Sequence, residues 1–129
     1  AYGPGFVEIN KVRHDGHLVV TPDAPITAWP TAFDALRAED FAALLVHRPE
    51  LVLLGTGNRQ RFPHPRLTSA LIDARIGVEV MDTPAAARTY NILMAEGRRV
   101  LAVFMQDRSR IAMTVAVGKQ VPQFSAAST

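Results

Sequence analysis

Residues 51–57 have the sequence Leu51-Val52-Leu53-Leu54-Gly55-Thr56-Gly57, and this stretch decides the fold class. Its first four residues form an unbroken apolar run, which is too short for a helix because Pro49 precedes it and glycines follow it. Such a run is typical of a strand that is covered on both faces. We therefore predict a buried strand over 51–54 that ends at Gly55-Thr56-Gly57.

The chain that follows this strand alternates between helical and strand patterns. Apolar residues at helical spacing follow Pro65, Gly77 is expected as the left-handed residue at the end of that helix, and a strand is expected over 76–81. The next helix is expected to start at Thr83, whose hydroxyl can cap it, and to run to Glu96. A buried strand over 100–105 completes the alternation. This order predicts a three-layer α/β domain with a central mixed, partly parallel sheet and helices on its faces.

The chain before residue 51 predicts further strands and one more helix. Residues 6–10 alternate apolar and polar side chains, and Asp15-Gly16 suits a two-residue turn, so we expect an N-terminal β-hairpin between 12–14 and 17–20. These strands are expected to pack beside the central sheet or to extend it. Prolines interrupt the next stretch, where short strands are expected over 26–29 and near Phe33, followed by a helix from Glu39.

Composition limits the class of protein. The chain has 129 residues, 48% of them hydrophobic, with a net charge of +2 and no cysteine, which excludes disulfides and thiolate metal sites. Residues 1–121 are expected to form one domain, with a further strand over 111–117 and a frayed tail over 122–129. No apolar run is long enough to cross a membrane, so we expect no membrane insertion. Basic and acidic residues are interspersed, so nucleic-acid binding is not expected either.

Two turns are the candidate site. If the strands at 51–54 and 76–81 are parallel, the loops that leave them lie at one edge of the sheet, where open α/β folds bind ligands. Glycines would let a small anionic ligand approach the backbone, and arginines would supply donors. The candidate ligand-binding residues are Gly55, Thr56, Gly57, Asn58, Arg59, Arg61, Asp82, Thr83 and Tyr90.

Each of these residues also has a structural interpretation. The glycines can simply shape a turn, Asp82 and Thr83 can cap a helix, and Tyr90 fits the apolar stripe of its helix as a core residue with its hydroxyl satisfied. His14 and His17 would lie on either side of the predicted hairpin turn, but two ligands do not make a metal site. We therefore expect no metal and no cofactor, and the catalytic residues, if there are any, are unknown.

Four segments of the chain resemble one known family. They are Tyr2-Gly3-Pro4-Gly5-Phe6, residues 53–59, residues 76–83, and the stretch from Ala86 to Arg98 that contains Tyr90-Asn91. In this order they resemble the Mth938-like family of small α/β domains of unknown function, which includes mitochondrial complex I assembly factor 3 and the adipogenesis-associated domain protein. The resemblance implies a three-layer α/β domain with a mixed sheet. It carries over no catalytic residue.

The expected function follows from the resemblance and from the incomplete set of reactive residues. We expect a non-enzymatic protein-interaction or assembly-assisting domain with a protein partner. The alternative is a small anionic-ligand-binding protein or an enzyme that uses the 55–61 loop and the helix start at 82–83. The chain resembles the bacterial members, so we expect it in the cytoplasm, whereas some eukaryotic relatives are mitochondrial.

Overall fold

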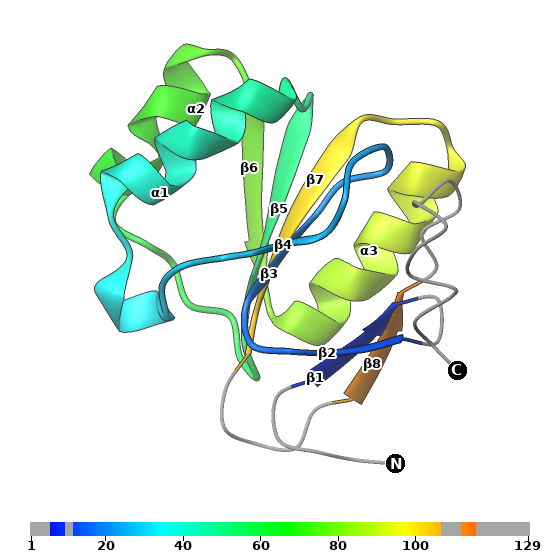
Figure 1. Cartoon of the computed structure of the whole chain (residues 1–129). Helices are drawn as coiled ribbons and strands as arrows, with labels where there is room; N and C mark the ends of the chain where they lie inside the picture. The colour runs from blue at the N-terminus through cyan, green and yellow to red at the C-terminus, as the bar shows by residue number, and fades with distance from the viewer. Residues whose placement is uncertain (1–5, 10–11, 107–111, 116–129) are drawn as a thin grey trace.

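The computed structural model describes residues 6–9, 12–106 and 112–115, and its centre is a mixed five-stranded sheet (Figure 1). The strand order is β4-β3-β7-β5-β6. The three parallel strands are β5 (Leu51–Thr56), β6 (Gly77–Met81) and β7 (Val100–Met105), with Leu51 opposite both Gly77 and Val100. Strand β3 (Leu18–Val20) runs antiparallel to β7, and β4 (Thr27–Ala28) forms the edge beyond it. The predicted mixed, partly parallel sheet is therefore confirmed.

Helices cover both faces of this sheet (Figure 1). One face carries α1 (Ala38–Ala42), η2 (Ala43–His47), η3 (Pro65–Thr68) and α2 (Ser69–Asp73), and the other carries α3 (Thr83–Ala95). Successive residues of a strand point to opposite faces, so Leu53 and Ala102 pack under α3 while Val52 and Leu101 pack under α1 and α2. Every residue of β5 and β7 is buried. The predicted strand with two covered faces is confirmed, and it extends to Thr56 instead of ending at Leu54.

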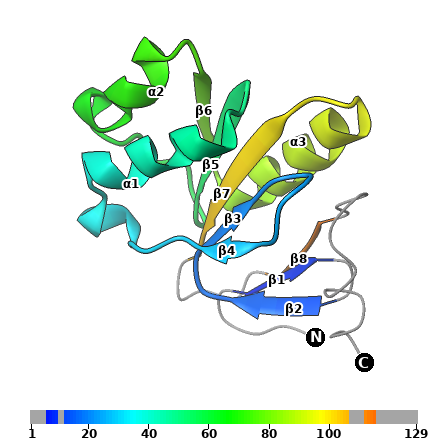
Figure 2. The same ribbon diagram turned by 45° about the horizontal axis from the view of Figure 1, so that its top comes forward.

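The N-terminal strands pair differently from the prediction. Strands β1 (Phe6–Ile9), β2 (Val12–Asp15) and β8 (Ala112–Val115) form a separate three-stranded sheet in the order β2-β1-β8 (Figure 2). An antiparallel N-terminal pair does exist, but it joins β2 to β1, whereas β3 joins the main sheet. The predicted hairpin across Asp15-Gly16 is wrong. Gly16 has the positive φ of 83° that the turn chemistry suggests, yet the chain uses this bend to pass from one sheet to the other.

Three local predictions also need correction. The left-handed residue after α2 is Arg75, with a φ of 64°, and Gly77 instead opens β6. The segment near Phe33 forms a short 3-10 helix, η1 (Phe33–Ala35), instead of a strand. The helix expected from Glu39 is a shorter α-helix, α1, followed directly by the 3-10 segment η2, and the chain turns at Arg48 with a φ of 49°.

Other local predictions are confirmed. The short strand expected over 26–29 is present as β4, and the strand expected over 111–117 contains β8. The helix expected from Thr83 to Glu96 is present as α3, and Gly97 follows it with a φ of 81°. The predicted tail over 122–129 lies outside the described residues. Within the described part of the chain, none of the helices is long and apolar enough to cross a membrane.

Candidate functional site

The turns after β5 and β6 meet at one edge of the sheet. The Thr83 amide donates a hydrogen bond of 2.8 Å to the Gly57 carbonyl, and the Gly57 amide donates one of 2.7 Å to Thr83 Oγ1. Parallel pairing of β5 with β6 brings these segments together, as the sequence predicts. We call the residues 55–61 together with 82–83 the rim.

The Thr83 hydroxyl also reaches the third parallel strand. It donates a hydrogen bond of 2.6 Å to the carbonyl of Met105, the last residue of β7, and Thr83 is fully buried. Both capacities of the hydroxyl are therefore used inside the protein. The prediction that this hydroxyl caps the helix is wrong: the cap is Asp82, whose carboxylate accepts a bond of 2.7 Å from the Ala85 amide.

Gly55 is required for close packing at the rim. A Cβ atom built at this position would lie 2.9 Å from Thr83 Oγ1 and 3.0 Å from Thr83 Cα. The space beside Gly55 is therefore filled by the start of α3 and does not admit a ligand. Gly57 has a φ of 95°, which is the conformation a turn glycine supplies.

The rest of the loop is held by Thr56 and Arg61. Thr56 Oγ1 donates to the Arg59 carbonyl at 2.7 Å and accepts from the Arg61 amide at 2.9 Å. The Arg61 guanidinium donates to the Thr56 carbonyl at 2.7 Å and 3.2 Å and lies over the Phe33 ring at 4.5 Å. Arg61 is thus part of the loop's own structure. Asn58 and Arg59 are exposed at the tip of the loop.

Tyr90 is not at the rim. It lies two turns further along α3, about 10 Å along the helix axis from Thr83, and it is fully buried with its ring edge-on to Phe104. Its predicted place in the core is confirmed. Its hydroxyl, however, has no hydrogen-bond partner in the described part of the chain, so the expected satisfied hydroxyl is not found. Burial, together with the negative charge of Asp23, raises the pKa of Tyr90.

The two histidines near Gly16 do not face each other across a hairpin. His14 lies on β2, which pairs with β1, and His17 precedes β3, where its Nδ1 accepts a bond of 3.1 Å from the Gln106 amide. Among the residues that the structure describes, no group of three or more potential metal ligands is present.

Sequence reasoning missed a cavity of about 280 Å³ at the opposite edge of the sheet. Its wall combines the segment after β3, the end of η2 and the connection from α3 to β7, and it includes Thr21, His47 and Arg99. These segments are far apart in the sequence and share no motif. No local pattern could have identified this site, although the opposite placement of Arg98 and Arg99 from Arg59 was predictable from parallel pairing.

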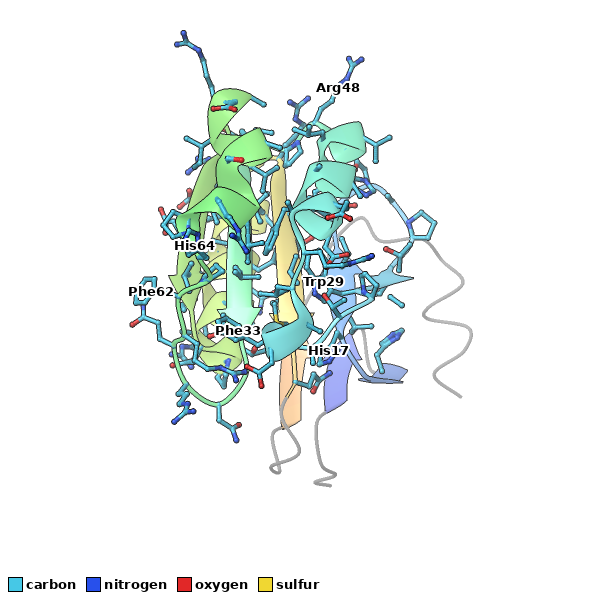
Figure 3. All side chains as sticks on the ribbon, turned by 90° about the vertical axis from the view of Figure 1, so that its left-hand side faces the viewer. His17, Trp29, Phe33, Arg48, Phe62 and His64 are labelled. Carbon is cyan, nitrogen blue, oxygen red and sulfur yellow. The ribbon has the colours of Figure 1, made fainter. Side chains whose placement is uncertain are left out.

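Large apolar side chains are also exposed on the surface. Phe62, in the loop after β5, is 71% exposed and projects outward (Figure 3). Ile92 on α3 is 60% exposed.

The fold and the rim define a class: a three-layer α/β domain with a mixed sheet, whose strand-end loops are held by their own hydrogen bonds. The chain belongs to the family described as a protein of unknown function, DUF498/DUF598, whose model matches residues 1–105.

Solved structures agree with this assignment. A crystal structure of a Bordetella parapertussis protein is 43% identical, covers 83% of this chain and 92% of its own, and superposes with a TM-score of 0.74. The solution structure of a Bordetella pertussis protein described as a Mth938-like domain is 36% identical, with coverage of 81% and 82% and a TM-score of 0.65. The resemblance to Mth938-like domains is therefore confirmed.

A curated relative has a functional name. The Bos taurus protein called NADH dehydrogenase [ubiquinone] 1 alpha subcomplex assembly factor 3 is 32% identical over 112 residues. The match takes in 85% of this chain but only 60% of the bovine protein.

Proposed function

We propose that this chain is a non-enzymatic protein-interaction domain that assists the assembly of a protein complex. The observation that carries this proposal is its 32% identity over 112 residues to a relative named as an assembly factor of NADH dehydrogenase. The proposed partner is accordingly a protein, here a subunit or a second assembly factor of that complex.

The hydrogen bonds within the rim support a protein-interaction role over an enzymatic or anion-binding role. The hydroxyls of Thr56 and Thr83 and the guanidinium of Arg61 are engaged in bonds within the loop and with neighbouring strands. A nucleophile or an anion-binding group would have to give up those bonds before acting on a substrate. The alternative, a small anionic ligand at the rim, would depend mainly on exposed Asn58 and Arg59 and on the start of α3.

Phe62 and Ile92 are the side chains that we propose as partner contacts. They lie on the loop beside the rim and on α3, and both expose most of an apolar side chain. Burial of large apolar and aromatic side chains dominates the energy of many protein interfaces. Arg61 is unsuitable as a test residue, because its replacement would disturb the loop itself.

The proposal is tested in the source cell with a tagged full chain. We expect affinity capture after cross-linking to enrich subunits or assembly factors of NADH dehydrogenase. We expect Phe62→Ser and Ile92→Ser to reduce that enrichment, whereas Ser69→Ala, another exposed position, should preserve it. Deletion of the gene should lower the amount of assembled NADH dehydrogenase on a native gel. A normal amount of the complex in the deletion strain, with no specific capture, would contradict the proposal.

We also propose a cytoplasmic location for this bacterial-type chain. Cell fractionation tests it directly: we expect the protein in the cytosolic fraction, and recovery with the membranes would overturn this part of the proposal.

A further inference from the structure

The cavity of about 280 Å³ lies at the amino ends of the parallel strands, on the opposite edge from the rim. In Figure 1 the loop between β3 and β4 reaches the end of the sheet where α3 passes into β7. The antiparallel pairing of β3 with β7, with Val20 opposite Ala102, places Thr21 beside the start of β7. Segments from three parts of the chain thus enclose one space.

The wall of this cavity is largely apolar. Met94 from the last turn of α3 is half-buried, Val100 at the start of β7 is 1% exposed, and Pro49 before β5 is buried. Small-molecule sites in proteins are concave and mostly apolar, with a few polar groups that orient the ligand. This cavity is at the small end of their size range, so it suits a compact ligand.

Thr21 lies in the wall of the cavity. It is 5% exposed, and its Oγ1 is buried without a hydrogen-bond partner within the described part of the chain. Because this oxygen has almost no accessible surface, it does not contact a molecule in the cavity. The orientation of a ligand therefore depends on the charged side chains at the cavity mouth.

The charges at the cavity mouth indicate the sign of the ligand. Arg98, Arg99 and His47 contribute basic groups to the lining, and Asp23 contributes one acidic group. Glu50 compensates Arg98, because its Oε1 lies 3.5 Å from Arg98 Nε. Arg99 meets Glu50 through its backbone, because its amide donates a hydrogen bond of 2.9 Å to the same oxygen. The Arg99 guanidinium is thus the group best placed to bind a carboxylate, since its fork of donors matches two oxygens.

We propose that this cavity binds a small organic acid, with its carboxylate at Arg99 and its apolar body against Met94 and Val100. The site is distinct from the rim and does not depend on the proposed assembly function. Asp23 opposes the carboxylate by charge repulsion, so it limits the affinity instead of contributing to it.

The test is a titration of the full chain at neutral pH. Binding is monitored through the amide chemical shifts in nuclear magnetic resonance spectra. Hexanoate is the probe, 1-hexanol tests the apolar body alone, and acetate tests the carboxylate alone. We expect hexanoate to shift the amides of residues 97–101 in a saturable way at ~10 mM or below. The two partial probes should bind at least about tenfold more weakly, because each lacks one of the two contacts.

Two variants and a matched control locate the site. Arg99→Gln should weaken hexanoate binding about fivefold or more, through loss of a charged hydrogen bond. Asp23→Asn should strengthen hexanoate binding about threefold by removing a repulsive charge. Arg59→Gln, the same change at the opposite edge, should leave binding unchanged.

Several outcomes would overturn the proposal. They are the absence of saturable shifts at 97–101, equal binding by Arg99→Gln and the unaltered chain, or shifts confined to 55–61. The last result would instead place the anion site at the rim. None of these outcomes affects the capture and native-gel tests of the assembly function, so the two proposals fail separately.

Discussion

Thr83 and Gly57 bond to each other in both directions: the Gly57 amide donates to Thr83 Oγ1 at 2.7 Å, and the Thr83 amide donates to the Gly57 carbonyl at 2.8 Å. With the further bond from Thr83 Oγ1 to the Met105 carbonyl at 2.6 Å, one side chain ties the end of β5 to the end of β7 at the first residue of α3. This relationship makes Thr83 the structural centre of the rim.

Replacing Thr83 tests that role. Thr83→Val keeps the shape of the side chain but leaves the buried Gly57 amide and Met105 carbonyl without their partner. We expect the free energy of unfolding to fall by about 2–4 kcal/mol, since each buried unpaired group costs roughly 1–3 kcal/mol. Urea denaturation measures this loss. Thr83→Ser keeps the hydroxyl and should lose only about 1 kcal/mol, for the missing methyl group. Equal losses for both variants would mean that the hydrogen bonds of the Thr83 hydroxyl do not contribute to the stability of the protein.

Gly55 tests the close approach between β5 and α3. In Gly55→Ala the new Cβ would lie 2.9 Å from Thr83 Oγ1 and 3.0 Å from Thr83 Cα, so the helix start must move. We expect a loss of about 1–3 kcal/mol in the free energy of unfolding, which is typical of overpacking. Gly77→Ala is the matched control, because its Cβ would meet only Leu51 Cδ1, at 3.2 Å. The contact interpretation fails if Gly77→Ala is the more damaging of the two changes.

We expect the protein to lose stability in acid because of the carboxylate of Asp40. Burial alone would raise the pKa of Asp40, but hydrogen bonds from the Arg37 side chain, the Thr31 hydroxyl and the Arg37 amide outweigh it and lower the pKa. A group with a lowered folded-state pKa stabilises the protein above its unfolded pKa, about 3.9, and loses that contribution as the pH falls through the folded-state value. The free energy of unfolding should therefore decrease below about pH 4.

The variant Asp40→Asn isolates this effect, since an amide does not titrate in this range. We expect the variant to be less stable than the unaltered chain at about pH 7, with a smaller difference between the two at about pH 3. Urea denaturation at the two pH values measures the difference. An equal difference at both values would show that the charge of Asp40 contributes nothing.

We expect that replacing Tyr90 by phenylalanine leaves the free energy of unfolding nearly unchanged or raises it. Its hydroxyl has no hydrogen-bond partner in the described ranges of the chain, so Tyr90→Phe removes a desolvated polar group and should change the free energy of unfolding by between 0 and about +1 kcal/mol. Tyr90→Ala should instead cost about 3–5 kcal/mol, because it removes the ring that packs against Phe104. A loss above about 1 kcal/mol in Tyr90→Phe would reveal a bonded hydroxyl.

Much of the fold could be predicted from local patterns. The unbroken apolar runs of β5 and β7 correspond to strands with both faces covered, and Pro84 and Gly97 lie at the start and just beyond the end of α3. The convergence of the two turns at the rim follows from parallel pairing of neighbouring strands. These features depend on residues close together in the chain, where periodicity and backbone preference act directly.

The pairing partners could not be predicted in the same way. Asp15-Gly16 has the composition of a hairpin turn, yet β2 pairs with β1, and β3 pairs with β7. Turn chemistry permits a bend, but it does not choose which strand edge the chain meets after the bend. That choice depends on burial of Leu18 and Val20 against α3, far away in the sequence.

The sequence by itself determined the order of the elements, the two doubly covered strands and the edge at which the rim forms, because these depend on local periodicity and on the geometry of parallel strands. Only the tertiary structure decided that Thr83 bonds to two strand ends instead of capping its helix, that Tyr90 carries a buried hydroxyl without a partner in the described residues, and that Thr21 and Arg99 line one cavity. Each of these depends on packing between distant segments, which lets a side chain choose among partners that local sequence cannot distinguish.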